Sequence, residues 1–357
     1  MKKSRKPLST NNLIILLLIV ALTIPLLSSS CSFSPSSKET RDGFYFDTII
    51  TITLYGSHDE NERLFTGCFD LAKKYENLFS TEISTSDVSR INNAKGHPVI
   101  VDSETLALVE KGLNYEEISG GCFSITCGAL TGLWDVSGRA KNFDNESPIP
   151  EKSEISAALS SVGGEKIAID PEKYEITLLD KNTRLDLGGI AKGYIADRMK
   201  DYLLSQGCKN AIINLGGNVL CIGRRPDNNP FTVGVQKPFE NDGTAAFTLP
   251  ADSLSVVTSG DYQRYFTKDG ILYHHIMDLK TGYPAKSGLD SVTIVSDSSA
   301  DGDALSTICF VLGKEKSEVF LSELSKSQPD SQYDAVFIDT DGNISSTKGL
   351  SAIIDIR

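Results

Sequence analysis

The stretch Asp186–Asp197 reads DLGGIAKGYIAD and sets three glycines, one lysine and two acids at the start of a helical apolar pattern. Glycine in a helix interior costs roughly 1 kcal/mol against alanine, so three of them need a reason. Bare backbone at Gly188 and Gly189 indicates a helix N-terminus that a ligand or an ion can approach closely. Lys192, one turn further, can reach a phosphate or a carboxylate. A tight turn followed by a helix with a solvated lysine is the other interpretation, and no GxxxxGK[ST] phosphate loop is present.

The N-terminus has the features of an export signal. Four basic residues among the first six positions precede an apolar run from Leu13 to Leu27, and three serines then lead to Cys31. A short basic segment, an apolar stretch too short to span a bilayer comfortably and small residues before a cleavage point describe a secretory signal. Because the arrangement is similar to a bacterial lipoprotein signal, we expect residues 1–30 to be removed and Cys31 to be lipidated. The alternative is an uncleaved membrane anchor; either way the chain is tethered at the extracytoplasmic face of the cell membrane.

Charge and cysteine usage limit the partners of the mature chain. Without residues 1–30 it carries 31 basic against 47 acidic residues, a formal charge of −16, so nucleic acid is disfavoured as a partner. Residues 31–43 are polar and rich in serine, which predicts a flexible tether before a domain at 44–357. The other six cysteines show no metal-ligand spacing and lie mostly among apolar residues, which favours buried free thiols, with one disulfide left open.

Strand and helix periods alternate after the tether and predict an α+β fold with a mixed or antiparallel sheet. The segment Phe46–Tyr55 alternates Ile and Leu with Thr, as a half-buried strand does, and a helical pattern follows from Leu64 to Phe79. From Ser119 to Trp134 glycine and threonine interrupt the pattern, which predicts loops. Further strands are expected at 211–214, 231–236, 254–257, 292–296, 335–339 and 352–356, and helices at 103–118, 189–204, 300–312 and 316–324. We expect one catalytic domain, in which two lobes could meet near residues 140–185.

Two further clusters carry groups suited to chemistry. HHIMDLKTGYPA (His274–Ala285) follows SGDYQRYF (Ser259–Phe266), and its hydrogen-bonding groups beside a proline turn are typical of a site rather than a core. SADGDALSTICFVLG (Ser299–Gly313) places Asp303 and Thr307 four residues apart, so that carboxylate and hydroxyl share one helical face. Two hard oxygens from one turn suit Mg²⁺, although helix capping is the commoner role for an acid at such a place.

Taken in order, these motifs resemble the ApbE family of FAD:protein FMN transferases. The resemblance is carried by DLGGIAKGY, NLGGN (Asn214–Asn218), SGDYQRYF, HHIMDLKTGYP and DALSTICFVLG, and upstream by FSTEISTSDVSRIN (Phe79–Asn92) and GGCFSITCGALTGLW (Gly120–Trp134). It implies a single ApbE-like α+β domain and a Mg²⁺-dependent enzyme. Such an enzyme binds FAD, cleaves its pyrophosphate, passes FMN to a Thr or Ser hydroxyl of a target protein and releases AMP. Acceptors in the family are often membrane-associated redox subunits.

The resemblance also implies a role for individual positions. Asp186 and Lys192 would contact FAD, and the main chain of Gly189 would join the side chains of Asp303 and Thr307 around Mg²⁺. His275, with Asp278 and Thr281 nearby, would assist removal of the proton from the acceptor hydroxyl. The residues expected to line the flavin nucleotide pocket are Phe46, Ser86, Cys122, Phe123, Thr126, His275 and Ile276.

The sequence departs from the family pattern at four positions. Leu279 stands where the family usually has proline, Ser124 where it has aspartate, Asn218 where an acid is frequent and Phe46 where many members have methionine. Two other functions use nearly the same residues: a Mg²⁺-dependent FAD pyrophosphatase, with water in place of the acceptor hydroxyl, and a flavin-binding lipoprotein without turnover. Release of AMP without an acceptor would favour the first, and FAD that stays intact with Mg²⁺ would favour the second.

Overall fold

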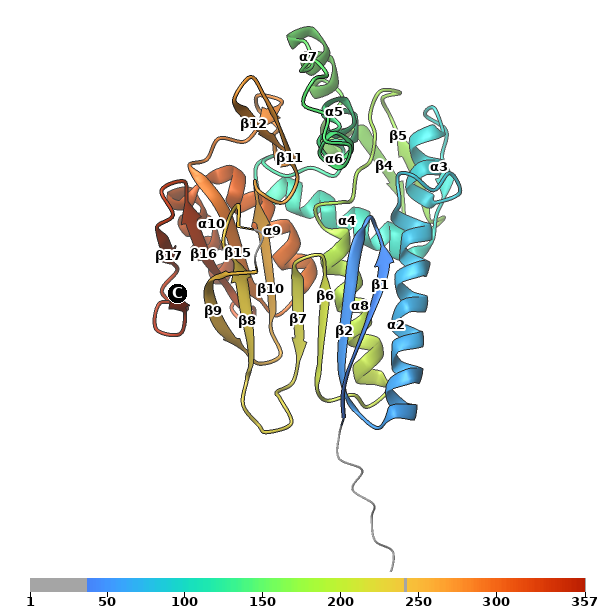
Figure 1. The fold of residues 1–357 in the computed structure, drawn as a ribbon. Coiled ribbons are helices and arrows are strands. Elements are labelled where there is room, and N and C mark those ends of the chain that lie inside the picture. Colours follow the sequence, from blue (N-terminus) through green and yellow to red (C-terminus); the bar gives the residue numbers. More distant parts are fainter. Residues whose placement is uncertain (1–36, 241–242, 357) are drawn as a thin grey trace, which may run out of the picture.

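Eight strands form the central sheet in the order β1-β2-β6-β7-β10-β15-β16-β17, and all neighbouring strands are antiparallel (Figure 1). The computed structural model describes residues 37–240 and 243–356. The strands are β1 (Ser37–Tyr45), β2 (Thr48–Gly56), β6 (Ala211–Leu215), β7 (Asn218–Ile222), β10 (Ser255–Gly260), β15 (Leu289–Ser296), β16 (Tyr333–Asp339) and β17 (Ile344–Ser346). The predicted α+β class with an antiparallel sheet is therefore confirmed.

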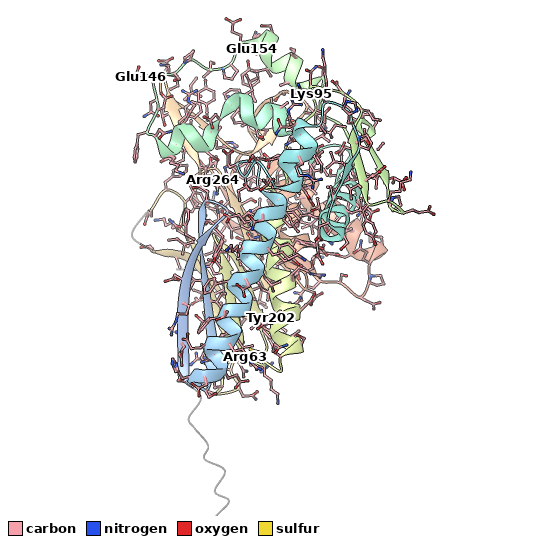
Figure 2. All side chains as sticks on the ribbon, turned by 90° about the vertical axis from the view of Figure 1, so that its right-hand side faces the viewer. Arg63, Lys95, Glu146, Glu154, Tyr202 and Arg264 are labelled. Atoms are coloured by element: carbon pink, nitrogen blue, oxygen red, sulfur yellow. The ribbon has the colours of Figure 1, made fainter. Side chains whose placement is uncertain are left out.

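Helices cover one face of this sheet. They are α2 (His58–Phe79), α8 (Ala191–Ser205), α9 (Ser299–Leu312) and α10 (Lys314–Ser327). The alternation in β2 sends Ile50, Ile52 and Leu54 into the core beneath these helices, where all three are fully buried. Tyr202 of α8 reaches across to α2, where its hydroxyl donates to the carbonyl of Arg63 at 3.4 Å (Figure 2).

A second, smaller sheet covers part of the other face. It consists of β8 (Phe231–Gln236), β9 (Ala245–Ala251) and β18 (Asp355–Ile356), in the order β18-β9-β8. Strand β16 shows how both faces are used: Ala335 and Phe337 belong to the core under the helices, while Val336 and Ile338 belong to the core under the small sheet. Burial on both faces fixes the register of the central sheet, because a one-residue slip would exchange the two sets.

A satellite core lies beyond the ends of the central strands, within the same domain (Figure 1). It is formed by Leu130, Trp134, Val136, Ile155, Phe266 and Met277. The elements that supply it are α5 (Gly128–Trp134), α6 (Val136–Lys141), α7 (Lys152–Leu159) and two hairpins, β11 (Tyr265–Lys268) with β12 (Ile271–His274) and β13 (Met277–Asp278) with β14 (Tyr283–Pro284). The indole N–H of Trp134 donates to the Gly282 carbonyl at 2.8 Å and so links α5 to the turn between β13 and β14.

The remaining elements flank this region. They are α3 (Asp87–Asn93), α4 (Ser103–Ile118), a 3-10 turn at Gly164–Lys166 and the small sheet β3 (Val99–Ile100), β5 (Glu175–Leu178) and β4 (Ile167–Asp170). Helix α4 begins where the sequence predicts, and the Asp102 carboxylate caps it by accepting from the Glu104 N–H. Among residues 37–240 and 243–356, no helix has both the length and the apolar character needed to cross a bilayer.

Two residues of the DLGGIAKGYIAD stretch join α8 to α9. A Cβ on Gly193 would lie 2.0 Å from the Ser299 carbonyl oxygen, so only glycine lets the two helices approach this closely. One turn later the Asp197 carboxylate accepts from the N–H groups of Ser299 and Ala300 at 2.9 and 3.0 Å and from the Ser298 hydroxyl at 2.8 Å. The second acid of the stretch thus satisfies the free N–H groups at the start of α9.

Three expectations from the sequence are wrong in part. Residues 37–43, expected within the tether, belong to β1, because their backbone pairs with β2 from Ser37↔Gly56 onward. The segment 119–134, expected as loops, ends in α5, whose Leu130 and Trp134 are buried in the satellite core. The strand expected at 352–356 is reduced to β18, because the Ile353 and Ile354 N–H groups turn back to the Leu350 carbonyl.

The expectations for residues 1–30 and Cys31 lie outside the described residues. The six described cysteines carry free thiols, and all of them except Cys127 are buried. This agrees with the prediction of buried free thiols.

Candidate active site

The turn before α8 places Asp186 and two glycines at the edge of the fold. The Asp186 Oδ1 accepts from the Gly188 N–H at 2.9 Å, and its Oδ2 accepts from the Thr131 hydroxyl at 2.8 Å. Asp186 therefore ties α5 to the turn, while its side chain stays partly exposed. Gly189 follows at the N-terminal end of α8, where a Cβ would lie 3.0 Å from the Phe123 ring. The bare backbone at Gly189 gives room to that ring.

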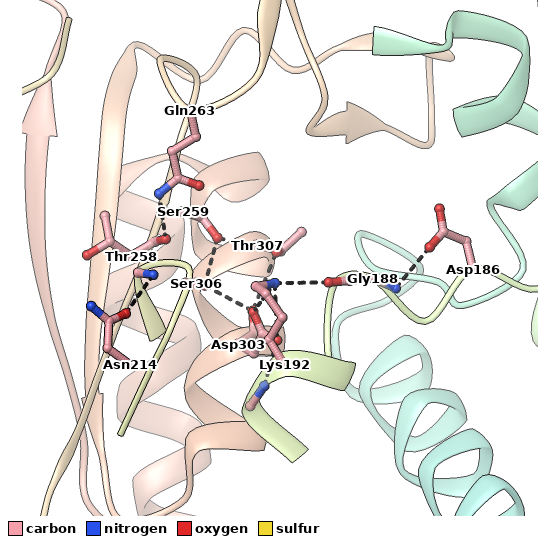
Figure 3. Close-up of polar contacts among 12 residues, drawn as sticks. Asp186, Gly188, Lys192, Asn214, Thr258, Ser259, Gln263, Asp303, Ser306 and Thr307 are labelled. Atoms are coloured by element: carbon pink, nitrogen blue, oxygen red, sulfur yellow. Dashed lines mark hydrogen bonds and ion pairs between the residues drawn. The ribbon is translucent and has the colours of Figure 1, made fainter. Parts of the chain in front are cut away.

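The centre of the candidate site is the ion pair between Lys192 and Asp303. The Lys192 Nζ lies 3.2 Å from Asp303 Oδ1 and 3.5 Å from Oδ2, and it donates to the Gly188 carbonyl at 3.1 Å (Figure 3). The Asp303 side chain is only 4% exposed and that of Lys192 is 25% exposed. A carboxylate this buried needs a cationic or hydrogen-bonding partner, and Lys192 supplies the positive charge.

The surroundings of Asp303 fix its orientation. The Gly193 N–H donates to Asp303 Oδ2 at 3.0 Å. One turn further along α9, the Thr307 hydroxyl lies 3.4 Å from the Asp303 carbonyl oxygen and 3.5 Å from the Ser259 hydroxyl. Ser259 also contacts Ser306 at 2.8 Å. Thr307 keeps partial exposure within a stretch of α9 that is otherwise buried from Gly302 to Phe310, so its hydroxyl faces the site.

The donors at this point suit a hard divalent cation. Asp303 offers a carboxylate, Thr307 a hydroxyl and the glycine turn a main-chain carbonyl, which are the oxygen ligands that Mg²⁺ prefers. The Lys192 ammonium already lies between the Gly188 carbonyl and the Asp303 carboxylate, which shows that a positive charge fits there. The carbonyl that contacts Lys192 is that of Gly188, the first of the two glycines whose bare backbone the sequence places at this helix start.

His275 directly follows β12, close enough to the ion pair for the Lys192 charge to act on it. Burial, followed by the positive charge of Arg264 and smaller effects that include Lys192, lowers the pKa of His275 to about 3. The ring is thus neutral, not half-charged near pH 6.5 as an unperturbed histidine would be. Its Nδ1 lies 3.3 Å from the Arg264 carbonyl, which can only accept, so Nδ1 carries the proton and Nε2 keeps a free lone pair.

The other residues of the HHIMDLKTGYPA segment have mainly structural contacts. The Thr281 hydroxyl donates to Asp278 Oδ2 at 3.1 Å, and the Asp278 carbonyl accepts from the Gly282 N–H at 2.8 Å, which closes a tight turn. His274 is buried, lies 2.9 Å from the Ala285 carbonyl through Nε2 and accepts from the Ile276 N–H through Nδ1. The contacts thus join Asp278 to Thr281 but neither of them to the His275 ring.

The expected pocket residues occupy two kinds of place. Ser86 and Thr126 are fully buried and already bonded, since Ser86 caps α3 and the Thr126 hydroxyl accepts from the Gly163 N–H at 2.7 Å. Cys122, Phe123 and Ile276 are buried as well, and of these Phe123 adjoins the site through Gly189. Phe46 is half-buried in the β1–β2 turn with φ 55°, a left-handed backbone that is strained for a residue other than glycine.

Several groups at the site were not singled out from the sequence. The Gly193 N–H and the Ser259 hydroxyl lie inside motifs that were recognised, but their contacts depend on how α8 and α9 pack. Thr131 and the Arg264 carbonyl gave no signal of their own. Backbone donors and acceptors of this kind have no mark in a sequence, because every residue carries them.

Lys192, Asp303 and Thr307 bring an ammonium group together with hard oxygen donors, and His275 is close enough to be affected by the Lys192 charge. This combination is typical of an enzyme that acts on a phosphate-bearing substrate. The model of the ApbE family matches residues 46–329. Curated relatives named FAD:protein FMN transferase include one from Klebsiella pneumoniae (39% identical, covering 75% of this chain and 80% of the relative) and one from Treponema pallidum (33%, 79% and 78%). The protein belongs to the ApbE family.

Solved structures agree with this assignment. An ApbE protein from Thermotoga maritima has a TM-score of 0.79 and 30% identity, and it covers 89% of this chain and 99% of its own. The flavinyl transferase ApbE from Pseudomonas stutzeri, in its apo form, has a TM-score of 0.76 and 26% identity and covers 90% and 98%. The predicted family and fold are confirmed.

Proposed function

We propose that this enzyme transfers FMN from FAD to a Thr or Ser hydroxyl of a target protein, with Mg²⁺ as cofactor and AMP as the second product. The single observation that carries the chemistry is the Lys192–Asp303 ion pair, which is flanked by the Gly188 carbonyl and the Thr307 hydroxyl. Asp303, Thr307 and the Gly188–Gly189 backbone would hold the cation. Bound there, Mg²⁺ would offset negative charge on the phosphate oxygens, the main requirement of phosphoryl transfer.

Lys192 would bind the anionic pyrophosphate, since its partly exposed ammonium group forms the ion pair with Asp303. Asp186, partly exposed at the same turn, would contact FAD from the other side, with Phe123 beside Gly189 forming part of the wall. Phe46, in the β1–β2 turn, would cover the flavin part of the bound nucleotide. Holding the nucleotide in one orientation supplies much of the rate, because reacting atoms are kept within attack distance.

His275 would accept the proton of the acceptor hydroxyl at Nε2. The hydroxyl oxygen then forms a bond to the FMN phosphorus, the bridging P–O bond to AMP breaks, and AMP leaves with the bridging oxygen. The low pKa of His275 in the free protein results from burial and from nearby positive charge. Negative charge on a bound nucleotide would offset the positive charge and make His275 more basic when substrate is present. Asp278 and Thr281 would support this segment by closing its turn.

The test is mass spectrometry of an acceptor protein after incubation with enzyme, FAD and Mg²⁺. A gain of one FMN mass on Thr or Ser, absent with Asp303→Ala, is the expected result. Asp301→Ala is the matched control, because Asp301 lies on the same helix but pairs with Lys111, and it should retain transfer. Release of AMP without labelled acceptor would indicate a pyrophosphatase. Intact FAD after long incubation would indicate a binding protein without turnover. Either result would reject the transferase.

We also propose that Cys31 is lipidated after removal of residues 1–30, so that the enzyme works at the extracytoplasmic face of the cell membrane, near membrane-associated redox proteins. The support is the order of basic, apolar and small residues before Cys31. Metabolic labelling with a palmitate analogue should mark the wild-type protein and not Cys31→Ala. A labelled Cys31→Ala variant, or an intact N-terminus by mass, would reject this assignment.

A further inference from the structure

We propose that Lys192 occupies the divalent-cation position in the free enzyme, so that the metal and a pyrophosphate-bearing nucleotide bind cooperatively. The proposal rests on the proposed function, because it assumes that Asp303 is a metal ligand and that the substrate carries a pyrophosphate. It adds a rule for the order of events: the cation position becomes available when an anion draws Lys192 away.

The contacts of the ammonium group are those expected of a substitute cation. The Lys192 Nζ lies 3.1 Å from the Gly188 carbonyl oxygen and 3.2 Å from Asp303 Oδ1. Both are hard oxygen donors of the type that Mg²⁺ binds. Among the ion pairs of residues 37–240 and 243–356, Lys192 is the cationic partner of Asp303, so its charge compensates a carboxylate that is 4% exposed.

The two carboxylate oxygens of Asp303 are not equivalent. Oδ2 accepts from the Gly193 N–H at 3.0 Å, and this bond is built into the contact between α8 and α9. Oδ1 has the shorter contact with the ammonium group, at 3.2 Å against 3.5 Å for Oδ2. An incoming cation would therefore compete for the oxygen that Lys192 now holds.

A divalent cation bound to Asp303 would displace Lys192 from its present contacts. Two positive charges on one carboxylate, at a site largely withdrawn from water, repel each other strongly. The lysine stem has four carbons joined by rotatable bonds, and its side chain is 25% exposed. The ammonium group can therefore move away from Asp303 toward the solvent. With no nucleotide present, the withdrawn ammonium gains only water, whereas a pyrophosphate gives it a charged partner.

Coupling of this kind is reciprocal: the nucleotide must tighten metal binding by the same factor as the metal tightens nucleotide binding. Replacing Lys192 by an uncharged residue removes both the competitor of the metal and the partner of the pyrophosphate. The variant should therefore bind the metal better than the wild type when no nucleotide is present, and it should lose most of the coupling.

The experiment measures Mn²⁺ binding to the mature protein by electron paramagnetic resonance of free Mn²⁺, without FAD, in the absence and presence of ADP. A blank with ADP alone corrects for the Mn²⁺–ADP complex. We expect Lys192→Met to bind Mn²⁺ at least tenfold more tightly than the wild type without ADP. We expect ADP to tighten binding at least tenfold in the wild type and less than threefold in Lys192→Met.

Two controls frame the result. Lys173→Met removes the same charge from an exposed pair with Asp170 and should bind Mn²⁺ as the wild type does. Asp303→Asn should bind Mn²⁺ at least tenfold more weakly with and without ADP. Thermal unfolding verifies that each variant is folded, and Lys192→Gln replaces Lys192→Met if the latter is not.

Equal or weaker Mn²⁺ binding by folded Lys192→Met, or equal effects of ADP on both proteins, would overturn the proposal. The transfer assay decides separately on the proposed function. Labelled acceptor without the Mn²⁺ coupling would reject only the role of Lys192, and the coupling without labelled acceptor would reject only the transferase.

Discussion

The Ser124 hydroxyl donates to the carboxylate of Glu116, and in this contact Ser124 is buried while Glu116 is partly buried. Ser124 also contacts the Thr126 hydroxyl at 2.7 Å, and the second Glu116 oxygen accepts from the Gly164 N–H. Ser124 is the position where the family pattern usually has aspartate. In this protein a carboxylate from α4 already lies beside that position, so an acid is supplied by a different residue.

Ser124→Asp, although it restores the family residue, should therefore destabilise the protein. Two carboxylates would meet in a partly buried place, and no ion pair of Glu116 is present among residues 37–240 and 243–356, so their repulsion should cost about 2–4 kcal/mol. Urea unfolding of Ser124→Asp, Glu116→Gln and the double variant measures the coupling between the two positions. We expect the double variant to recover most of the loss, and additive effects would contradict this explanation.

Gly193→Ala should weaken the fold and the site together. The added Cβ would clash with the Ser299 carbonyl. Moving α9 to relieve the clash should lower the free energy of unfolding by about 1–3 kcal/mol. Because Gly193 also orients Asp303, metal binding should fall as well. Gly132→Ala is the control: Gly132 is exposed in α5 with no atom near its missing Cβ, so the change should be neutral or stabilise by up to about 1 kcal/mol. Similar losses at both positions would contradict the close-contact explanation.

Asp197→Asn should destabilise α9 at its first turn. The carboxylate accepts three hydrogen bonds there, and replacing one oxygen by an amide nitrogen leaves a buried donor facing other donors. The expected loss is about 1–3 kcal/mol of unfolding free energy in urea. Asp201→Asn, on the exposed side of α8 beside Arg198, should change stability by less than about 0.5 kcal/mol. Hydrogen exchange should locate the loss of protection at Ser299 and Ala300 if the cap is responsible.

His275 should make stability depend on pH in a defined direction. Its pKa in the folded protein is about 3, below the value near 6.5 of an unfolded chain, so the unfolded state binds more protons between these values. Its contribution therefore favours folding at neutral pH and is lost as pH falls. Lowering the pH from 7 to 5 should destabilise the wild type relative to His275→Gln by up to about 2 kcal/mol, measured by urea unfolding. A constant difference would show that His275 is not held neutral.

The site motifs and the main helices could be predicted from the sequence, because each of them has a local pattern of residues. The i, i+4 spacing of Asp303 and Thr307 and the apolar period of α2 needed no tertiary information. Strand β1 was missed because its charged residues resemble a linker; as an edge strand it has one side in water, and its pairing with β2 makes it regular. Helix α5 ends at Trp134, which bonds to the Gly282 carbonyl and stacks on Tyr273, both more than a hundred residues later in the chain.

The low pKa of His275 and the position of Lys192 were beyond sequence reasoning for a similar reason. Both depend on which charges and carbonyls the fold brings near a side chain, and the Arg264 carbonyl and Asp303 belong to other elements. The role of Gly193 was visible only as an unexplained glycine. The reason for a glycine at this position is the Ser299 carbonyl, which lies where a Cβ would be.

Strand β1 also sets the distance between the place where the chain enters the fold and the catalytic edge. It begins at Ser37, and its far end turns at Phe46 and Asp47, where Lys141 of α6 binds Asp47 at 2.9 Å. Nine residues of strand span roughly 30 Å. With Cys31 lipidated as proposed above, the length of β1 would therefore separate Ser37, the residue of the described fold that is nearest the anchor in sequence, from the β1–β2 turn at the proposed flavin side.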